Sequence, residues 1–136
     1  PANVKRTILS INNKIEKNKE AIWQWEEKQI DDADIIIVAA GCVSRSAEEA
    51  VEVLRAKGLK VGLFRPITIW PFPDQLLEKV LAKAKTVIVP EMNMGQLIHK
   101  IKEIKPDNVQ AVQLNKYDGT LIMPDEIIQA IEEVAK

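Results

Sequence analysis

Cys42 and His99, the only cysteine and the only histidine of the chain, are the first candidates for chemistry. A cysteine acts as a nucleophile when its surroundings lower the pKa of its thiol, and the reaction also needs a base within reach. His99 falls inside a predicted helix, so the sequence places no base beside Cys42. We therefore expect Cys42 to be a buried or half-buried thiol and His99 to lie on the surface or in helix packing. No catalytic residue is predicted on this chain.

Metal and nucleotide sites also lack the residues they need. A zinc site takes several clustered ligands, and an iron–sulfur cluster commonly takes four cysteine thiolates. One cysteine and one histidine supply neither set. Gly41 is a lone glycine before a bulky pair, and the Met94-Gly95-Gln96 segment is equally far from a glycine-rich phosphate loop. We therefore expect no metal, dinucleotide or triphosphate site.

Two segments are harder to explain as structure alone. Residues 64–73 hold three prolines and three aromatic side chains, which stiffen a loop and suggest that something docks on it. Residues 91–96 place a carboxylate, two amides and two methionines together. The alternative for this second segment is a well-capped helix with a methionine-lined core. The candidates for an interface or a ligand loop are Arg45, Arg65, Trp70, Phe72, Glu91, Asn93 and Gln96.

The elements that position these segments follow from periodicity. Apolar, β-rich runs predict four strands, at residues 35–40, 61–67, 86–89 and 109–114. A helical pattern fills each gap, so right-handed crossovers give a parallel sheet covered on both faces. Ligands and partners gather at the carboxyl ends of such strands. The loops at those ends are residues 41–46, 66–72 and 90–96.

Several residues mark where the helices between the strands begin and end. Ser46 and Glu49 are predicted to form a capping box at the start of the first of these helices, and Gly58 to adopt the left-handed conformation after its end. Pro73 is predicted in the first turn of the second helix. Asn93 is predicted to cap the third helix, with the Gln96 side chain bonding back to it, and Pro124 to begin the last helix. Residues 115–120 are expected to form a turn, and residues 121–123 are a candidate short strand.

The first thirty residues have a different pattern. Residues 4–29 contain no Gly or Pro and carry isoleucines at helical spacing, so we expect one long helix, or two, lying against or beside the domain. Trp23 and Trp25 need cover in this polar segment. We favour packing on the domain's own sheet; the alternative is that they face a missing partner.

Composition narrows the class of protein. The chain has 136 residues, enough for one core. Its 19 basic and 20 acidic residues create no net field for nucleic acid or a membrane surface. The apolar runs are far shorter than the roughly 20 residues that span a bilayer. The single cysteine fits a reducing, cytoplasmic setting, and Pro1 at the first position suggests a piece of a longer chain.

The predicted fold class is α/β, a three-layer α/β/α domain with a mainly parallel sheet and the strand order 2-1-3-4. The predicted core is Ile36, Val38, Val51, Leu54, Val61, Leu63, Leu81, Val87, Val89, Leu97, Ile101, Val112 and Ile131.

The two segments at residues 64–73 and 91–96, following Ala39-Ala40-Gly41-Cys42, resemble the α subunit of 2-oxoacid:ferredoxin oxidoreductases, in the pyruvate:ferredoxin oxidoreductase superfamily. The resemblance covers residues 32–104. The sequence departs from the family pattern at Cys42, because the family often has a second small residue at this position after the glycine. It implies a linker helix at residues 1–31 and, at residues 32–136, a domain like the carboxy-terminal domain of transketolase.

The resemblance also implies partners and cofactors. The partners are the thiamine-related amino-terminal domain of the same α subunit, the β subunit and ferredoxin-like subunits. Thiamine diphosphate, magnesium and iron–sulfur clusters would lie on those other domains and subunits, and none on this chain. The sequence Ile-Thr-Ile-Trp-Pro-Phe-Pro at residues 67–73 favours 2-oxoglutarate or a branched-chain 2-oxoacid over pyruvate as substrate.

Two functions remain open from the sequence. The first is a non-catalytic domain that serves in assembly of the oxidoreductase. The second is a free-standing α/β module whose helix amino terminus at Asn93 binds a small anion. For the first, we expect Trp70 and Phe72 to be partly exposed or covered by a homodimer contact. A core role would bury both.

Overall fold

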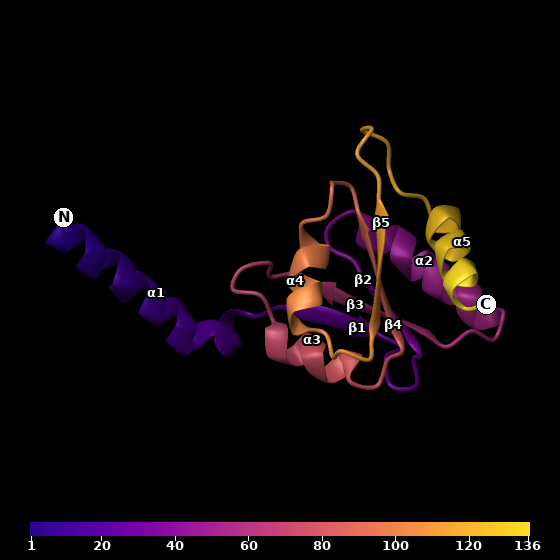
Figure 1. Ribbon diagram of the computed structural model, residues 1–136, viewed down its shortest axis with the longest axis horizontal. Helices are drawn as coiled ribbons and strands as arrows, with labels where there is room; N and C mark the ends of the chain where they lie inside the picture. The colour runs from indigo at the N-terminus through magenta and orange to yellow at the C-terminus, as the bar shows by residue number, and fades with distance from the viewer.

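A five-stranded sheet with the order β1-β3-β2-β4-β5 forms the middle of the molecule (Figure 1). The computed structural model describes all 136 residues. The strands are β1 (Trp25–Lys28), β2 (Ile35–Val38), β3 (Val61–Pro66), β4 (Thr86–Glu91) and β5 (Gln110–Asn115). Strands β2 to β5 are parallel, and β1 pairs with β3 in the antiparallel direction. The four predicted strands thus have the predicted order and direction.

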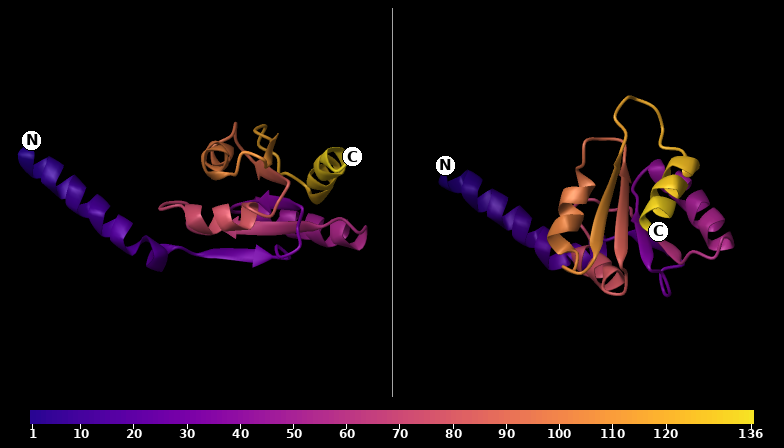
Figure 2. Two further views of the ribbon diagram at one scale, coloured as in Figure 1. Left: turned by 60° about the horizontal axis from the view of Figure 1, so that its bottom comes forward. Right: turned by 45° about the vertical axis from the view of Figure 1, so that its right-hand side comes forward.

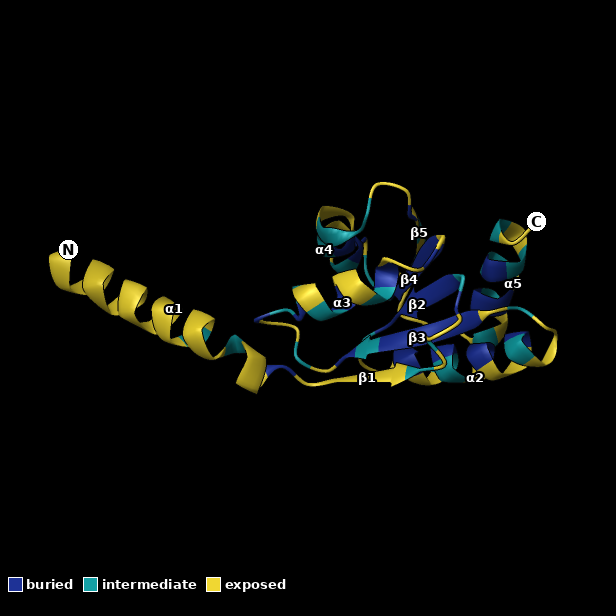
Figure 3. Cartoon of the chain, turned by 90° about the horizontal axis from the view of Figure 1, so that it is seen from below, coloured by how far each residue is buried: buried dark blue, intermediate teal, exposed yellow.

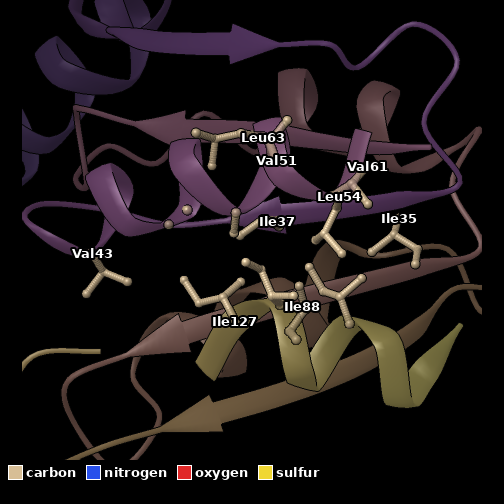
Figure 4. Packing of buried hydrophobic residues seen from close by; sticks show 14 of the residues in the cluster. Ile35, Ile37, Val43, Val51, Leu54, Val61, Leu63, Ile88 and Ile127 are labelled. Carbon is tan, nitrogen blue, oxygen red and sulfur yellow. The ribbon is translucent and has the colours of Figure 1, made fainter. Parts of the chain in front are cut away.

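Helices cover both faces of this sheet, which confirms the three-layer prediction. Helices α2 (Val43–Ala56) and α5 (Pro124–Val134) pack on one face, and α3 (Asp74–Leu81) and α4 (Leu97–Ile104) pack on the other (Figure 2). Because β2 lies in the middle, its side chains are buried on both faces. Ile35 and Ile37 join the cluster with α2 and α5 (Figure 4), whereas Ile36 and Val38 join the opposite one.

The predicted core is confirmed at eleven of its thirteen positions. Leu97 and Val112 are instead half-buried. Val112 lies on β5, an edge strand of the sheet, so a neighbouring strand flanks it on one side only. Leu97 is the first residue of α4 and lines the cleft described below.

The expectation for the amino-terminal region was wrong in two respects. Helix α1 (Ala2–Ile22) ends before residue 23, and it extends away from the sheet with no buried residue (Figure 3). It does not lie on the sheet, whose two faces are covered by the other four helices. Strand β1 follows and belongs to the sheet, although it falls within residues 1–31, which we expected to form only a linker helix.

Hydrogen bonds to the end of β3 explain why β1 is not helical. The N–H of Gln24 donates to Thr68 Oγ1 at 2.9 Å, and the N–H of Ile67 donates to the Gln24 carbonyl at 2.9 Å. Beyond them, Glu26 lies opposite Arg65 in the strand pairing. Pairing with an open sheet edge therefore overrides local helix propensity.

The two tryptophans of this region have different surroundings. Trp23 is buried, as expected for a ring that packs on its own domain, whereas Trp25 is partly exposed. The indole N–H of Trp25 donates to Glu27 at 3.0 Å.

Local signals at the other helix ends were correct in part. Gly58 has φ 86° after α2 and Pro124 is the first residue of α5, as predicted. Pro73 directly precedes α3 as its N-cap instead of lying in its first turn. Helix α2, however, begins at Val43, so Ser46 is not its cap. The Ser46 hydroxyl instead donates to the Ile122 carbonyl at 2.8 Å. Residues 121–123 form no strand.

Candidate functional site

A cleft of about 820 Å³ opens at the carboxyl edge of the sheet. The segments that follow β2, β3 and β4 form it, together with the end of α1 and the start of α4, so it lies where parallel sheets usually bind ligands or partners. Its lining includes Trp23 and Lys19 from α1, Cys42 after β2, Trp70, Phe72 and Asp74 after β3, Glu91, Met92 and Asn93 around the end of β4, and Gln96 and Lys100 beside α4.

Five of the seven predicted interface or ligand-loop residues line this cleft: Trp70, Phe72, Glu91, Asn93 and Gln96. The two arginines do not. Arg65 lies on β3 and pairs with Glu26 of β1 at 2.9 Å. Arg45 is exposed in the first turn of α2. The structure therefore gathers the two segments from the sequence into one site and leaves the arginines outside it.

Glu91 is buried and its carboxylate caps α4. One oxygen accepts the N–H of Leu97 at 2.6 Å, and the other accepts the N–H of Ile98 at 3.0 Å. These are two of the amides that a helix amino terminus would otherwise offer to an anion. The negative charge needed at this helix end is thus supplied from within the chain.

Asn93 caps a turn and not α4, contrary to the prediction. Its side-chain oxygen accepts the N–H of Gly95 at 2.7 Å and that of Gln96 at 3.0 Å. Gly95 has φ 110°, and a Cβ there would lie 2.8 Å from Gln113 Nε2. Glycine is therefore required at this position. Gln96 is exposed and makes no side-chain hydrogen bond back to the cap.

The aromatic part of the cleft is only partly covered. Trp70 is 66% exposed, whereas Phe72 is half-buried and packs against the cluster under α3 and α4. The core role that we considered for Trp70 is therefore wrong. An exposed indole beside a cleft leaves a large apolar surface for contact with another molecule.

The end of α1 supplies a wall that the sequence did not indicate. Lys19 Nζ lies 5.9 Å from the centroid of the Trp23 ring, a cation–π distance. The indole N–H of Trp23 is buried without a hydrogen-bond partner. These residues reach the cleft because the chain turns from α1 into β1 next to the loop after β3, a pairing that no local pattern predicts.

An ion pair closes another side of the cleft. Lys100 Nζ lies 2.9 Å from Asp74, at the start of α3, and 3.7 Å from Glu103. The hydrogen bond that the Lys100 ammonium donates to the Asp74 carboxylate raises the pKa of Lys100 above its usual value. The two partners are on different helices, so the pair also had no signal in the sequence.

The sulfur groups differ from expectation as well. Cys42 is exposed and not buried, because it lies at the turn before α2 on the rim of the cleft. Its Sγ is 3.8 Å from Met92 Sδ. His99 lies on the exposed side of α4 and does not line the cleft. The one histidine of the chain is therefore not beside the thiol, and no group of three or more His, Cys, Asp or Glu side chains that could hold a metal ion is present.

Most charged groups of the cleft are already paired within the chain. Glu91 holds backbone amides, and Asp74 holds Lys100. What remains accessible is aromatic and sulfur-containing surface, which suits contact with protein more than acid–base chemistry. None of the helices has both the length and the hydropathy that crossing a bilayer requires.

Comparison with known proteins assigns this chain to a family. The family model for the pyruvate:ferredoxin oxidoreductase core domain II matches residues 33–127. The chain is 42% identical over 126 residues to the 2-oxoglutarate synthase subunit KorA of Methanocaldococcus jannaschii, which covers 93% of this chain and 34% of that protein. It is 40% identical over 113 residues to the ketoisovalerate oxidoreductase subunit VorB of Methanothermobacter marburgensis, and this alignment covers 82% of this chain and 32% of that protein. The chain thus spans about a third of the length of these relatives.

Solved structures agree. The 2-oxoglutarate:ferredoxin oxidoreductase from Magnetococcus marinus, with 2-oxoglutarate, coenzyme A and succinyl-CoA bound, aligns with a TM-score of 0.87 at 28% identity, over 100% of this chain and 24% of that one. A split-gene transketolase aligns with a TM-score of 0.64 at 21% identity, over 81% of this chain and 40% of that one. The second likeness concerns the fold alone and confirms the expected transketolase-like architecture.

Proposed function

Because the chain belongs to the family of the pyruvate:ferredoxin oxidoreductase core domain II, we propose that it is the carboxy-terminal, non-catalytic domain of the α subunit of a 2-oxoacid:ferredoxin oxidoreductase. The whole enzyme would convert a 2-oxoacid, coenzyme A and oxidised ferredoxin into an acyl-CoA, carbon dioxide and reduced ferredoxin. Thiamine diphosphate, magnesium and the iron–sulfur clusters would lie on other domains and subunits, in the cytoplasm.

The observation that carries the assembly role is the exposure of Trp70, at 66%, on the rim of a cleft whose charges are already paired. Full burial of a large apolar side chain contributes about 1.5 to 3 kcal/mol. An assembly that covers Trp70 would gain this free energy. We propose that the amino-terminal domain of the same subunit or the β subunit supplies the cover.

The second candidate, a free-standing module that binds a small anion at the start of α4, is less well supported. Such a module needs free amides at the helix amino terminus. The Glu91 carboxylate already accepts two of them, from Leu97 and Ile98. An added anion would also meet the negative charge of Glu91.

The names of the two relatives bear on the substrate. One is a 2-oxoglutarate synthase subunit and the other a ketoisovalerate oxidoreductase subunit, at 42% and 40% identity. We propose 2-oxoglutarate or a branched-chain 2-oxoacid as the substrate of the whole enzyme. Turnover of the complete complex with each acid, and with pyruvate, would decide between them.

The test of the assembly role compares Trp70→Ala with Tyr117→Ala. Tyr117 is 67% exposed, nearly the same fraction as Trp70, but does not line the cleft. Both variants would be made in the full-length α subunit and co-expressed with the β subunit. We expect Trp70→Ala to reduce co-purification of the β subunit or to loosen the α subunit's own domain packing in limited proteolysis, and Tyr117→Ala to change neither.

Two results would contradict the assembly role of the cleft. If Trp70→Ala leaves both co-purification and proteolysis unchanged, the assembly role of this cleft is wrong. The same conclusion follows if Trp70→Ala destabilises the isolated chain by about 3 to 5 kcal/mol, since a loss of that size is typical of a core aromatic residue.

A further inference from the structure

Helix α1 carries an apolar stripe that the rest of the molecule leaves largely uncovered. Val4, Ile8, Ile11 and Ile22 are between 37% and 61% exposed, and Ile15 is half-buried. Figures 1 and 3 show why, since α1 extends away from the sheet and only its last turns reach the cleft. A helix within a protein gains most of its stability from packing of its apolar face, so this stripe needs a partner in the assembled protein.

The spacing of the stripe identifies the kind of partner. Residues 4, 8, 11, 15, 18 and 22 follow the alternating four-and-three spacing of a heptad repeat, with Asn18 as the one polar member. At 3.6 residues per turn, these positions span about 80° of the helix surface. So narrow a stripe matches the seam of a coiled coil, whereas a helix that packs on a sheet presents a wider apolar face. We call these six positions the α1 seam.

The residues beside the α1 seam identify the charge of the partner. They are Lys5, Asn12 and Lys19 on one side and Thr7, Lys14 and Ala21 on the other. No acidic side chain is among them. In a coiled coil these flanking positions face their counterparts on the other helix and set partner choice.

A second copy of α1 would therefore be a poor partner in either orientation, because its flanking positions offer only lysines and uncharged side chains. The helix as a whole has five basic residues against two acidic ones, although the complete chain has a net charge of −1. An acidic helix would complement it.

We propose that α1 forms a two-helix coiled coil with a helix in the remaining two-thirds of the same α subunit, and that this partner carries an apolar seam flanked by Glu or Asp. The inference rests on the proposed function, because it takes the chain to be part of such a subunit. The relatives leave ample length for the partner, since this chain covers only 34% of the first of them.

The experiment measures hydrogen exchange of residues 4–22 in the full-length α subunit and in the isolated chain. We expect slower exchange in the full-length subunit, without any other subunit present. Ile11→Asn should then speed that exchange about tenfold or more, which corresponds to losing one buried isoleucine. Leu9→Asn is the matched control, because Leu9 is similarly exposed but lies about 140° from Val4 around the helix.

The charge of the partner needs its own variant. Lys14→Glu should speed exchange in the full-length subunit, whereas Lys17→Glu, on the far side of α1, should not. Added salt should weaken the effect of Lys14, because salt screens exposed charges.

Several results would overturn the proposal. One is equal exchange of α1 in the full-length subunit and the isolated chain, and another is protection that appears only when the β subunit is added. Concentration-dependent dimerisation of the isolated chain that Ile11→Asn abolishes would assign the seam to a second copy. Co-sedimentation of the full-length subunit with phosphatidylglycerol vesicles, lost in Ile11→Asn, would assign it to a membrane surface.

The outcome is separable from that of the proposed function. Co-purification of the β subunit is scored in the same preparations. Protected α1 without β-subunit binding would keep the coiled coil and contradict the assembly with the β subunit. Binding of the β subunit while α1 stays unprotected would keep the assembly with the β subunit and contradict the coiled coil.

Discussion

The carboxylate of Glu91, at the end of β4, accepts the backbone N–H of Ile98 at 3.0 Å from within the protein interior. This bond joins the strand to the helix that follows it. It holds the start of α4 against the sheet and so shapes one wall of the cleft.

Glu91→Gln should destabilise the chain. A glutamine side chain has one oxygen and one NH₂ group, so it can accept only one of the two helix amides and points a donor at the other. Leaving a buried donor unpaired costs about 1 to 3 kcal/mol. The midpoint of urea unfolding measures the loss. Glu78→Gln, at an exposed position of α3, is the control and should change stability little. Equal stability of Glu91→Gln and the wild type would contradict the capping role.

Glu126 makes stability depend on pH. Its carboxylate accepts the N–H of Met123 at 2.8 Å and bonds Lys116 Nζ at 3.0 Å. These hydrogen bonds hold the pKa of Glu126 below its usual value of 4.5. A lowered pKa in the folded state gives stabilisation that is complete above the unfolded value and is lost as the pH falls through the folded value.

Glu126→Gln should therefore be less stable than the wild type at pH 7, by roughly 0.5 to 1 kcal/mol for a partly exposed cap. The difference should shrink as the pH falls below about 4.5 and the wild-type carboxylate takes up its proton. Thermal unfolding from pH 3 to pH 7 measures this. Glu133→Gln, an exposed position on the same helix, should show no such convergence, and a constant difference for Glu126→Gln would contradict the linkage.

Cys42 is a natural reporter of whether the cleft closes on assembly. Its thiol is exposed in this chain, so a thiol reagent should label it fully without denaturant. If a neighbouring domain covers the cleft in the complete oxidoreductase, as we propose, the labelling should slow markedly there. A Cys42→Ser, Tyr117→Cys protein is the control, with a thiol outside the cleft that should stay reactive. Unchanged labelling of Cys42 in the complex would show that the cleft remains open.

The isolated chain should neither bind thiamine diphosphate nor reduce an electron acceptor with a 2-oxoacid and coenzyme A. Its cleft carboxylates are engaged by backbone amides and Lys100, which leaves little to hold a diphosphate with its metal. Calorimetry with thiamine diphosphate and Mg²⁺ tests the binding. Tight, magnesium-dependent binding would contradict the assignment of the cofactor to other domains.

The sequence by itself determined the four parallel strands, their order and most of the core. The strands and the core depend on local runs of apolar residues, such as residues 35–38, which are apolar on both faces. The parallel direction follows from the helical pattern in each gap between the strands. The sequence also indicated the cleft, because the carboxyl ends of parallel strands meet at one edge of a sheet. The resemblance at residues 64–73 and 91–96 indicated the family.

Only the tertiary structure decided which charges meet in the cleft and where the amino-terminal region lies. Strand β1 exists because residues 25–28 find the open edge of β3, nearly forty positions later in the sequence. Asp74 and Lys100 pair across two helices, and Glu91 turns inward to cap α4 instead of facing a ligand. Such contacts depend on distances between segments that are remote in the chain, and a local pattern of residue types carries no information about those distances.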